Sequence, residues 1–385
     1  MAVSLARNAL LLGNVVTGLS VLAPAAMLPE LAAGLDVSIQ AAGWLVTFGA
    51  IVMCFGSPLM AWATTHIDRR TLMTVTLGIV AFGHIVSAFA PNYAVLLAAR
   101  LVLLAVAALY TPQAASTVAL IVSEKDRPGA IAYVFIGWSL AIAVGLPLLT
   151  FLAVQFGWRA AYGGIAVLAT VAMLLNAVGL PSGLRGAPLS LASWVEVARN
   201  RQIVLLLLIT IIVISGTFQT FVFIGPLFSG LTGAGPQVVA VTLAVAGFVG
   251  LLGNVATTRA VAGVGPYGMS LLLIATMFVG LLIWAFGAGA LAAMIAGMAI
   301  ASVGFAASNS IQQARLAIAA PALASASIAL NTSAIYVGQA IGSAIGAELI
   351  ARNMLTAVGF VAAAITGCAL LVVLMTRDES RVTPP

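Results

Sequence analysis

The sequence predicts an all-α membrane protein whose twelve transmembrane helices form two six-helix bundles. Composition is the first reason, because 63% of the residues are hydrophobic and only 6% are charged, whereas soluble domains carry about 25% charged residues. Apolar runs near the roughly 20 residues needed to cross a bilayer recur along almost the whole chain, with short polar breaks between them. A water-soluble fold needs a charged surface that these residues cannot supply, whereas a surface that faces lipid needs none.

The apolar runs define the expected spans. The longest polar break lies near the middle of the chain, so we expect an N-terminal bundle over residues 1–180, a cytoplasmic linker over 181–201, and a C-terminal bundle with a short cytoplasmic tail over 202–385. The first run is long and has no persuasive cleavage site, so it is expected to remain as a span. The spans are placed at residues 8–29, 40–63, 72–89, 93–117, 129–153, 160–180, 203–226, 236–256, 266–286, 289–312, 324–349 and 356–376.

The basic residues predict the orientation of the spans. With a cytoplasmic N-terminus, twelve bases fall in cytoplasmic segments and only Arg159 and Arg352 in outer loops, which is a strong positive-inside bias. Both termini are then cytoplasmic, as expected for a multi-pass protein of the bacterial inner membrane. The bases lie singly or in pairs, so no nucleic-acid-binding patch is predicted. The twelve cytoplasmic bases are Arg7, Arg69, Arg70, Lys125, Arg127, Arg185, Arg199, Arg201, Arg259, Arg315, Arg377 and Arg381.

The two halves of the chain are similar in sequence. Phe55 and Leu59 in the second span recur as Phe248 and Leu252 in the eighth, and an Ala-Thr-Thr triplet follows in both places. Glycines of the fifth span recur in the eleventh. Parallel repeats of this kind are typical of transporters that bind a substrate near the membrane midplane between two bundles.

Glycines and a proline predict close helix contacts in two spans. Small residues four or eight positions apart share one helix face, where two backbones can approach closely, and a proline removes a backbone hydrogen bond. The contacts could be static, or they could let the two halves slide during transport. The residues concerned are Gly137, Gly145 and Pro147 in the fifth span, and Gly338, Gly342 and Gly346 in the eleventh.

Arg100 and several uncharged residues are the candidate substrate-binding or coupling groups. A guanidinium in hydrocarbon costs about 3 kcal/mol, so Arg100 predicts snorkelling, a structural pairing or contact with a substrate. Neutral polar groups at membrane depth must face other helices or an aqueous cavity, and aromatic rings can stack on a ligand. The candidates are Arg100, Gln113, Trp138, Gln219, Asn254, Asn331 and Tyr336.

Groups that could bind a coupling proton are scarce. None of the nine acids lies clearly in mid-span, so the candidates are Glu30 and Glu348, near the outer ends of spans, and His84 in the third span. Helix packing is the alternative interpretation of His84. Cys54 and Cys368 lack disulfide or metal spacing, and no catalytic or cofactor-binding motif is present. We therefore expect no enzyme activity, cofactor or metal.

Several stretches, in order, resemble the major facilitator superfamily over essentially the whole chain. They are residues 57–61 and 67–70, Arg100, residues 137–141, 145–147 and 157–159, and residues 218–226, 250–254 and 329–333 with the glycines that follow. The closest likeness is to the twelve-span drug:proton antiporter type and its branch of sugar, purine and chloramphenicol exporters. The sequence departs from that pattern at Ala61, Thr65 and Asp68, where glycine, aspartate and glycine are usual, and residues 18–22 of the first span hold no acid.

The resemblance implies a carrier that works by alternating access, with two bundles rocking about a central cavity. It implies export of a small amphiphilic molecule in exchange for protons, a cytoplasmic gate at Asp68, Arg69 and Arg70, and a monomer surrounded by membrane lipid. The missing first-span acid favours an alternative, an uncoupled facilitator or an importer of a small metabolite. A non-transporting membrane protein, such as a ligand sensor or an assembly partner, is the alternative from another class.

Overall fold

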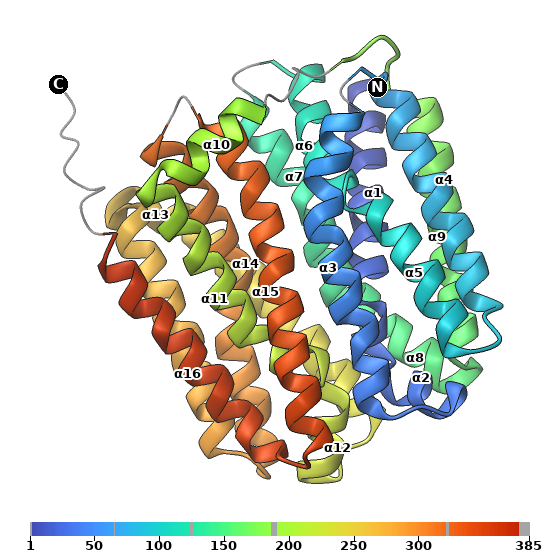
Figure 1. Ribbon diagram of the computed structural model, residues 1–385, viewed down its shortest axis with the longest axis vertical. Helices are drawn as coiled ribbons and strands as arrows, with labels where there is room; N and C mark the ends of the chain where they lie inside the picture. Colours follow the sequence, from blue (N-terminus) through green and yellow to red (C-terminus); the bar gives the residue numbers. More distant parts are fainter. Residues whose placement is uncertain (1, 65, 124–125, 186–190, 321–322, 377–385) are drawn as a thin grey trace. The chain divides into compact units, whose positions relative to one another are not determined.

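The protein folds into two compact helical units, residues 1–189 and 190–385 (Figure 1). The structure is a computed structural model that describes residues 2–64, 66–123, 126–185, 191–320 and 323–376, and these residues form no β-strand. The boundary between the units falls within the predicted linker, while the bounds of the two predicted bundles stay predictions. Lys125, Arg377 and Arg381, which count toward the predicted charge bias, lie outside the described residues.

Unit 1 contains six membrane-length segments, and its first helix, α1, packs against most of the others. The α1 helix is the most buried of these segments, and it contacts α3, α6, α7 and α9. The elements of unit 1 are α1 (Ala2–Ala26), α2 (Leu28–Leu35), α3 (Ile39–Ala63), α4 (Arg69–Ala88), α5 (Tyr93–Ala107), α6 (Tyr110–Ile121), α7 (Arg127–Leu140), the π-helical turn η2 (Ala141–Gly145), α8 (Leu146–Phe156) and α9 (Trp158–Gly179).

Unit 2 is likewise organised around its first long helix, α11, which packs along α15 and α16. A short amphipathic helix, α10, precedes it. The elements of unit 2 are α10 (Leu191–Arg199), α11 (Arg201–Val222), α12 (Ile224–Thr232), α13 (Pro236–Phe286), α14 (Leu291–Ala319), α15 (Ala324–Ala351) and α16 (Leu355–Leu374).

The described helices account for twelve spans. Eleven helical stretches are long and apolar enough to cross a membrane, but α13, with 51 residues, would be about 77 Å long, far more than the roughly 30 Å hydrocarbon core. Gly265, with φ 77° and ψ 157°, breaks it before Pro266. The break gives two spans at the predicted places, so each unit has six spans, and the predicted all-α, twelve-span architecture is confirmed.

Side-chain caps and one proline explain where several helices begin or deform. Asp68 and Asn92 begin α4 and α5, each accepting a hydrogen bond from a backbone N–H three residues on. Pro147 has no N–H to bond the carbonyl of residue 143, and the π-helical turn lies just before it, where the N–H of Leu146 donates to the carbonyl of Ala141. The predicted weak point of the fifth span is therefore a π-bulge.

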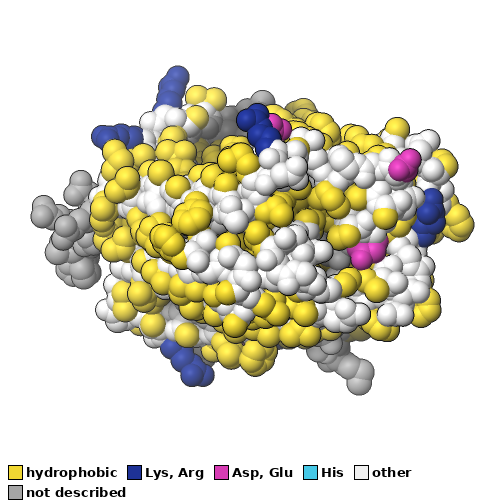
Figure 2. Space-filling model, turned by 90° about the horizontal axis from the view of Figure 1, so that it is seen from below, with side chains coloured by type: hydrophobic (Ala, Val, Ile, Leu, Met, Phe, Trp, Pro, Cys, Tyr) yellow, Lys and Arg dark blue, Asp and Glu magenta, His cyan; other side chains and the backbone are white. Residues whose placement is uncertain are grey.

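The surface carries the apolar side chains that a lipid environment accepts. Phe89 and Phe286 are 81% and 78% exposed, an arrangement that would promote aggregation in water. Figure 2, which looks along the helices from below Figure 1, shows many apolar side chains and only a few scattered charged ones at that end. Hydrocarbon removes the penalty of exposing such groups, which is why a 6% charged chain can form this fold.

Candidate functional site: buried polar groups within the spans

Arg100 on α5 lies in the core of unit 1 and is fully buried. Its Nη1 donates to the Tyr162 hydroxyl at 3.3 Å, and its Nη2 donates to the carbonyl oxygens of Ser20 and Val21 at 3.1 and 3.5 Å. The guanidinium carbon lies 5.9 Å from the centre of the Tyr162 ring. Arg100 therefore does not snorkel. It is paired with neutral groups, and its Nε–H remains without a partner.

A proline in α1 supplies one of these acceptors. In an α-helix the carbonyl of Ser20 would accept from the N–H of residue 24, but Pro24 has none. The carbonyl is thus left free inside the membrane, where an unpaired backbone group is costly. Arg100 satisfies it from the neighbouring helix. The sequence contained this signal, a proline four residues after Ser20, but not the identity of the donor.

His84 on α4 joins the Arg100 cluster through Ser20. Its Nε2 lies 2.8 Å from the Ser20 hydroxyl oxygen, and that hydroxyl also contacts the carbonyl of Val16 at 2.7 Å. The His84 ring stacks on Tyr162, with ring centres 5.7 Å apart, and its Nδ1 has no partner. His84 is fully buried and packs in the helix interface, yet it shares Ser20 and Tyr162 with the arginine.

A second polar chain in unit 1 connects α1, α6 and α7. Trp138 Nε1 donates to Thr111 Oγ1 at 3.1 Å, Thr111 Oγ1 donates to Asn14 Oδ1 at 2.9 Å, and Asn14 Nδ2 donates to the carbonyl of Val134 at 3.0 Å. Trp138 was a sequence candidate, whereas Asn14 and Thr111 were missed. Their signal was weak, because a single amide and a single hydroxyl in apolar helices are common packing residues.

Unit 2 holds a comparable network in the equivalent spans. Thr210 Oγ1 on α11 donates to Asn331 Oδ1 on α15 at 2.7 Å, and Asn331 Nδ2 donates to Asn309 Oδ1 on α14 at 3.0 Å. The unit 1 chain joins spans one, four and five, and this one joins spans seven, ten and eleven. The two units therefore place buried polar contacts between equivalent spans, in keeping with the internal repeat that the sequence indicates.

The other unit 2 candidates are buried or half-buried, and no described hydrogen bond joins them to one another. Gln219 is fully buried, its Nε2 donates to the carbonyl of Ser215 at 3.1 Å, and its Oε1 has no partner. Asn254 on α13 has a buried Oδ1 without a partner, and Tyr336 on α15 is buried. Unpaired amide oxygens at membrane depth are acceptors that a ligand could use.

Two residues predicted for different roles contact each other. Arg69, a predicted gate residue, is buried at the start of α4, and its Nη1 donates to Oε1 of Gln113 on α6, a predicted substrate or coupling residue. Arg70, the next residue, is exposed. Whether Arg69 and Arg70 act as a gate stays a prediction.

Asp68 ties the start of α4 to the chain that follows α9. Its Oδ1 accepts from the N–H of Thr71 at 3.2 Å, and its Oδ2 accepts from the N–H of Gly183 at 2.6 Å. Next to it, the N–H of Arg69 donates to the carbonyl of Leu184 at 2.9 Å. The carboxylate thus holds the beginning of the inter-unit segment against unit 1.

The predicted contact glycines each pack against a helix of their own unit. A Cβ on Gly137 would lie 2.5 Å from the carbonyl oxygen of Leu11 on α1, and one on Gly342 would lie 2.5 Å from that of Ser215 on α11. Gly145 meets α1, while Gly338 and Gly346 meet α11 or the residue that ends it. Their further role in sliding of the halves stays a prediction.

The two acidic candidates lie in different settings. Glu348 is exposed, and its Oε1 accepts from Nε of Arg352 at 2.7 Å on the same helix surface. Glu30 is half-buried on the short helix α2, outside the membrane-length segments, and burial raises its pKa above the usual carboxyl value. No described hydrogen bond links either acid to Arg100.

Arg315 is a buried cation on a helix that continues past its predicted end. The tenth span was expected to end at residue 312, with Arg315 in the cytoplasmic segment after it, but α14 continues to Ala319 and Arg315 is fully buried. Its cytoplasmic side stays a prediction. Its Nη1 and Nη2 donate to the hydroxyls of Ser270 and Thr376 at 3.1 and 2.6 Å. Ser270 lies on α13 and Thr376 just after the end of α16, so hydropathy along the chain could not reveal these partners.

Fold and site together define a polytopic helical membrane protein with polar networks inside its spans. Residues 10–343 match the sequence profile of the Major Facilitator Superfamily, and the chain belongs to that family of transporters. The resemblance inferred from the motifs is thereby confirmed at the level of the superfamily.

Relatives and solved structures agree with this assignment. The chain is 29% identical over 383 residues to the inner membrane transport protein YdhP of Escherichia coli, covering 97% of this chain and 96% of that protein. It is 26% identical over 360 residues to a "probable sugar efflux transporter" of Mannheimia succiniciproducens, covering 93% and 90%. The crystal structure of a D-xylose–proton symporter superposes with a TM-score of 0.82 at 13% identity over 100% of both chains, which confirms the predicted major facilitator fold.

Proposed function

We propose that this transporter is a secondary active exporter of a small amphiphilic molecule, such as a sugar, a nucleoside-like compound or a drug. It works by alternating access with protons as the coupling ion, as a monomer of the drug:proton antiporter type in a bacterial inner membrane, with both termini cytoplasmic. The observation that carries export is the alignment of 93% of the chain with a protein named as a sugar efflux transporter.

The unpaired polar atoms support a neutral or weakly charged substrate with hydrogen-bonding groups. Arg100 offers a free Nε–H, and Gln219 and Asn254 offer free amide oxygens. A buried donor or acceptor without a partner costs about 1–3 kcal/mol. A ligand hydroxyl or ring oxygen that reached any one of these atoms would recover that free energy.

The shortage of acids supports His84 as the group that binds the coupling proton. Within the described membrane-length segments Glu348 is the only acid, and it is exposed and paired with Arg352. Protonation of His84 would put a second positive charge beside Ser20, because the His84 ring contacts the Ser20 hydroxyl and Arg100 donates to the Ser20 carbonyl. Repulsion between the two cations would loosen Arg100, and this would link proton binding to substrate binding.

One observation favours the runner-up, an uncoupled facilitator or an importer. The acceptors that Arg100 uses on α1 are backbone carbonyls, which do not titrate, and residues 18–22 contain no acid. A transporter built in this way would move its substrate down a gradient without protons.

The test begins with a thermal-shift screen of the purified protein against sugars, nucleosides, antibiotics and dyes. Flux of each stabilising compound is then measured in proteoliposomes with and without an imposed pH gradient. We expect flux to increase when the proton gradient is directed opposite to substrate movement. Flux that ignores the gradient removes the antiport claim and leaves the facilitator, while absence of flux for every stabilising compound contradicts transport of these classes.

Variants separate the binding and coupling roles. Arg100→Lys keeps the charge but loses the planar fork that reaches Tyr162 and the α1 carbonyls at once, so it should lose most flux under all conditions. His84→Gln should abolish the response to the pH gradient and retain downhill exchange. The matched control is Arg259→Lys on exposed α13 surface, which should behave like the unmodified protein.

A further inference from the structure

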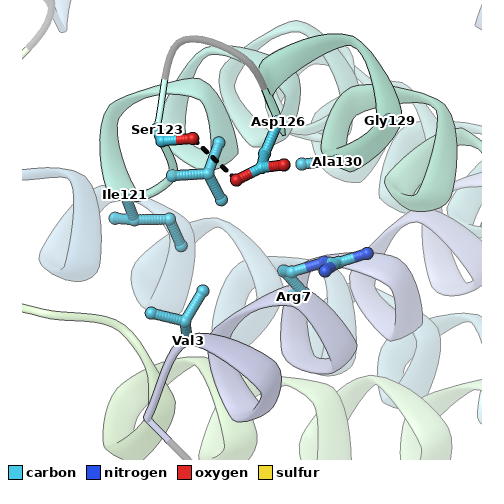
Figure 3. Close-up of a pocket in the computed structure, with 8 residues that line it drawn as sticks. Val3, Arg7, Ile121, Ser123, Asp126, Gly129 and Ala130 are labelled. Carbon is cyan, nitrogen blue, oxygen red and sulfur yellow. Dashed lines mark hydrogen bonds between the residues drawn. The ribbon is translucent and has the colours of Figure 1, made fainter.

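A pocket at one end of unit 1 lies apart from the Arg100 cluster and has no part in the proposed transport step (Figure 3). Its volume is about 540 Å³, and it is bounded by the first turns of α1, the end of α6 and the start of α7. Three membrane-length segments begin or end there, at residues 3, 121 and 129. The pocket is therefore at the depth where a membrane meets water, on the side predicted to be cytoplasmic.

The pocket wall holds one cation and one anion that are not paired with each other. Arg7 on α1 has no described hydrogen bond or ion pair; its guanidinium carbon lies 4.7 Å from the centre of the Tyr133 ring, and its buried Nε has no partner. Asp126 precedes α7 but makes no side-chain cap of that helix. Its Oδ2 accepts from the Ser123 hydroxyl at 2.6 Å. Figure 3 shows Arg7 and Asp126 on opposite sides of the pocket.

Tyr133 holds the cation in place for a ligand. The Tyr133 hydroxyl donates to Asn8 Oδ1 at 2.7 Å, which fixes the ring on which the guanidinium lies. A guanidinium stacked in this way keeps its N–H edge free, and that edge matches the two oxygens of a carboxylate or phosphate. Asp126, with an oxygen left over, is suited to accept from a primary ammonium.

Apolar side chains complete the pocket. Val3, Ile121 and Val122 line it, and Figure 3 shows Val3 and Ile121 on the side away from Gly129. A ligand that satisfies all parts of the wall has an anionic group, a primary ammonium and an apolar body. We propose that this pocket binds zwitterions of that kind, with the anion on Arg7 and the ammonium on Asp126.

Two sources can supply this chemistry, a free apolar amino acid or the headgroup of an aminophospholipid. For the first source, binding of L-leucine, N-acetyl-L-leucine and L-leucinamide to the purified full-length protein is measured by calorimetry. For the second, native mass spectrometry compares retention of phosphatidylethanolamine with that of phosphatidylcholine and phosphatidylglycerol. Choline has no N–H, and phosphatidylglycerol has no ammonium, so both should be retained less.

Matched substitutions in the protein test each contact. Asp126→Asn and Arg7→Gln should each weaken binding about tenfold, as loss of a charge-assisted hydrogen bond implies, and Arg7→Lys should weaken it less. N-acetyl-L-leucine lacks the ammonium, and its loss of affinity relative to leucine should be small in Asp126→Asn. L-leucinamide lacks the carboxylate, and its loss of affinity should be small in Arg7→Gln. The controls are Asp36→Asn and Arg259→Gln, exposed residues outside the pocket.

Each outcome decides the proposal. Leucine binding with this pattern identifies a free-solute site, and selective retention of phosphatidylethanolamine with the same variant sensitivity identifies a lipid site; both support a zwitterion pocket. If neither probe binds selectively, or if selective binding survives both Asp126→Asn and Arg7→Gln, the proposal is wrong. Melting temperatures of all variants show whether a loss of binding reflects a loss of fold.

Discussion

The substitution Gly137→Ala tests how closely the fifth span must approach the first. An added Cβ would lie 2.5 Å from the carbonyl oxygen of Leu11, 2.8 Å from Cβ of Asn14 and 3.0 Å from the amide nitrogen of Val15. Favourable carbon contacts begin near 3.5 Å, so the closest one is about 1 Å too short. Two of the three atoms belong to the α1 backbone, which no rotamer change can move. The α1 and α7 helices must therefore separate.

The magnitude follows from that separation. Overpacking of this kind costs about 1–3 kcal/mol. The same movement pulls Asn14 from the carbonyl of Val134, now 3.0 Å away, and a lost buried hydrogen bond adds about 1 kcal/mol. We expect a total destabilisation of about 2–4 kcal/mol, equivalent to a fall of about 4–16 °C in Tm for a unit of this size.

Thermal unfolding in detergent, followed by size-exclusion chromatography of the heated protein, measures the effect. Gly163→Ala on α9 is the matched control, because its Cβ would meet no atom within 4 Å and alanine favours a helix by up to about 1 kcal/mol. Gly342→Ala, whose Cβ would approach the Ser215 carbonyl, should repeat the loss in unit 2. If Gly137→Ala melts within about 2 °C of Gly163→Ala, the inferred contact between α1 and α7 is wrong.

Three further predictions concern charge and polar contacts. Burial raises the pKa of Glu30 above 4.5, so the folded state binds the proton more tightly than the unfolded state. The contribution of Glu30 to stability should therefore be greatest below pH 4.5 and decline as pH rises through the folded pKa. Glu30→Gln should flatten this part of the Tm–pH curve, and an unchanged slope would contradict the assignment. Asn331→Leu removes the partner of Asn309 and the closer of two acceptors of Thr210, and it should cost about 1–3 kcal/mol. The loss is read from Tm against the milder Asn331→Ser. Tyr162→Phe removes one acceptor of Arg100 but keeps the ring, so flux should fall severalfold without loss of fold; unchanged flux would argue against a role for this bond.

Hydropathy and spacing were sufficient for the architecture. In a bilayer most backbone polar groups are satisfied within their own helix, so span length and composition along the chain predict the helices without knowledge of their neighbours. One boundary error, the early end of the tenth span before Arg315, arose where this local rule fails, because a charge that finds hydroxyl partners far along the chain can be buried on a helix.

The candidate site was predictable only in part. Residue type singled out Arg100 and Asn331, because a charge or an amide at membrane depth needs a partner. The partners themselves, such as the Ser20 carbonyl freed by Pro24, lie 80 positions from Arg100 in the sequence. No local pattern encodes contacts of that range.

The sequence by itself therefore determined that this protein is a helical membrane protein of the major facilitator type, since apolar length is a property of each segment alone. Only the tertiary structure decided which polar groups meet, because each pairing depends on how α1 or α11 packs among its neighbours. It also decided that Arg7 and Asp126 line one pocket without pairing, although they are 119 positions apart in the sequence.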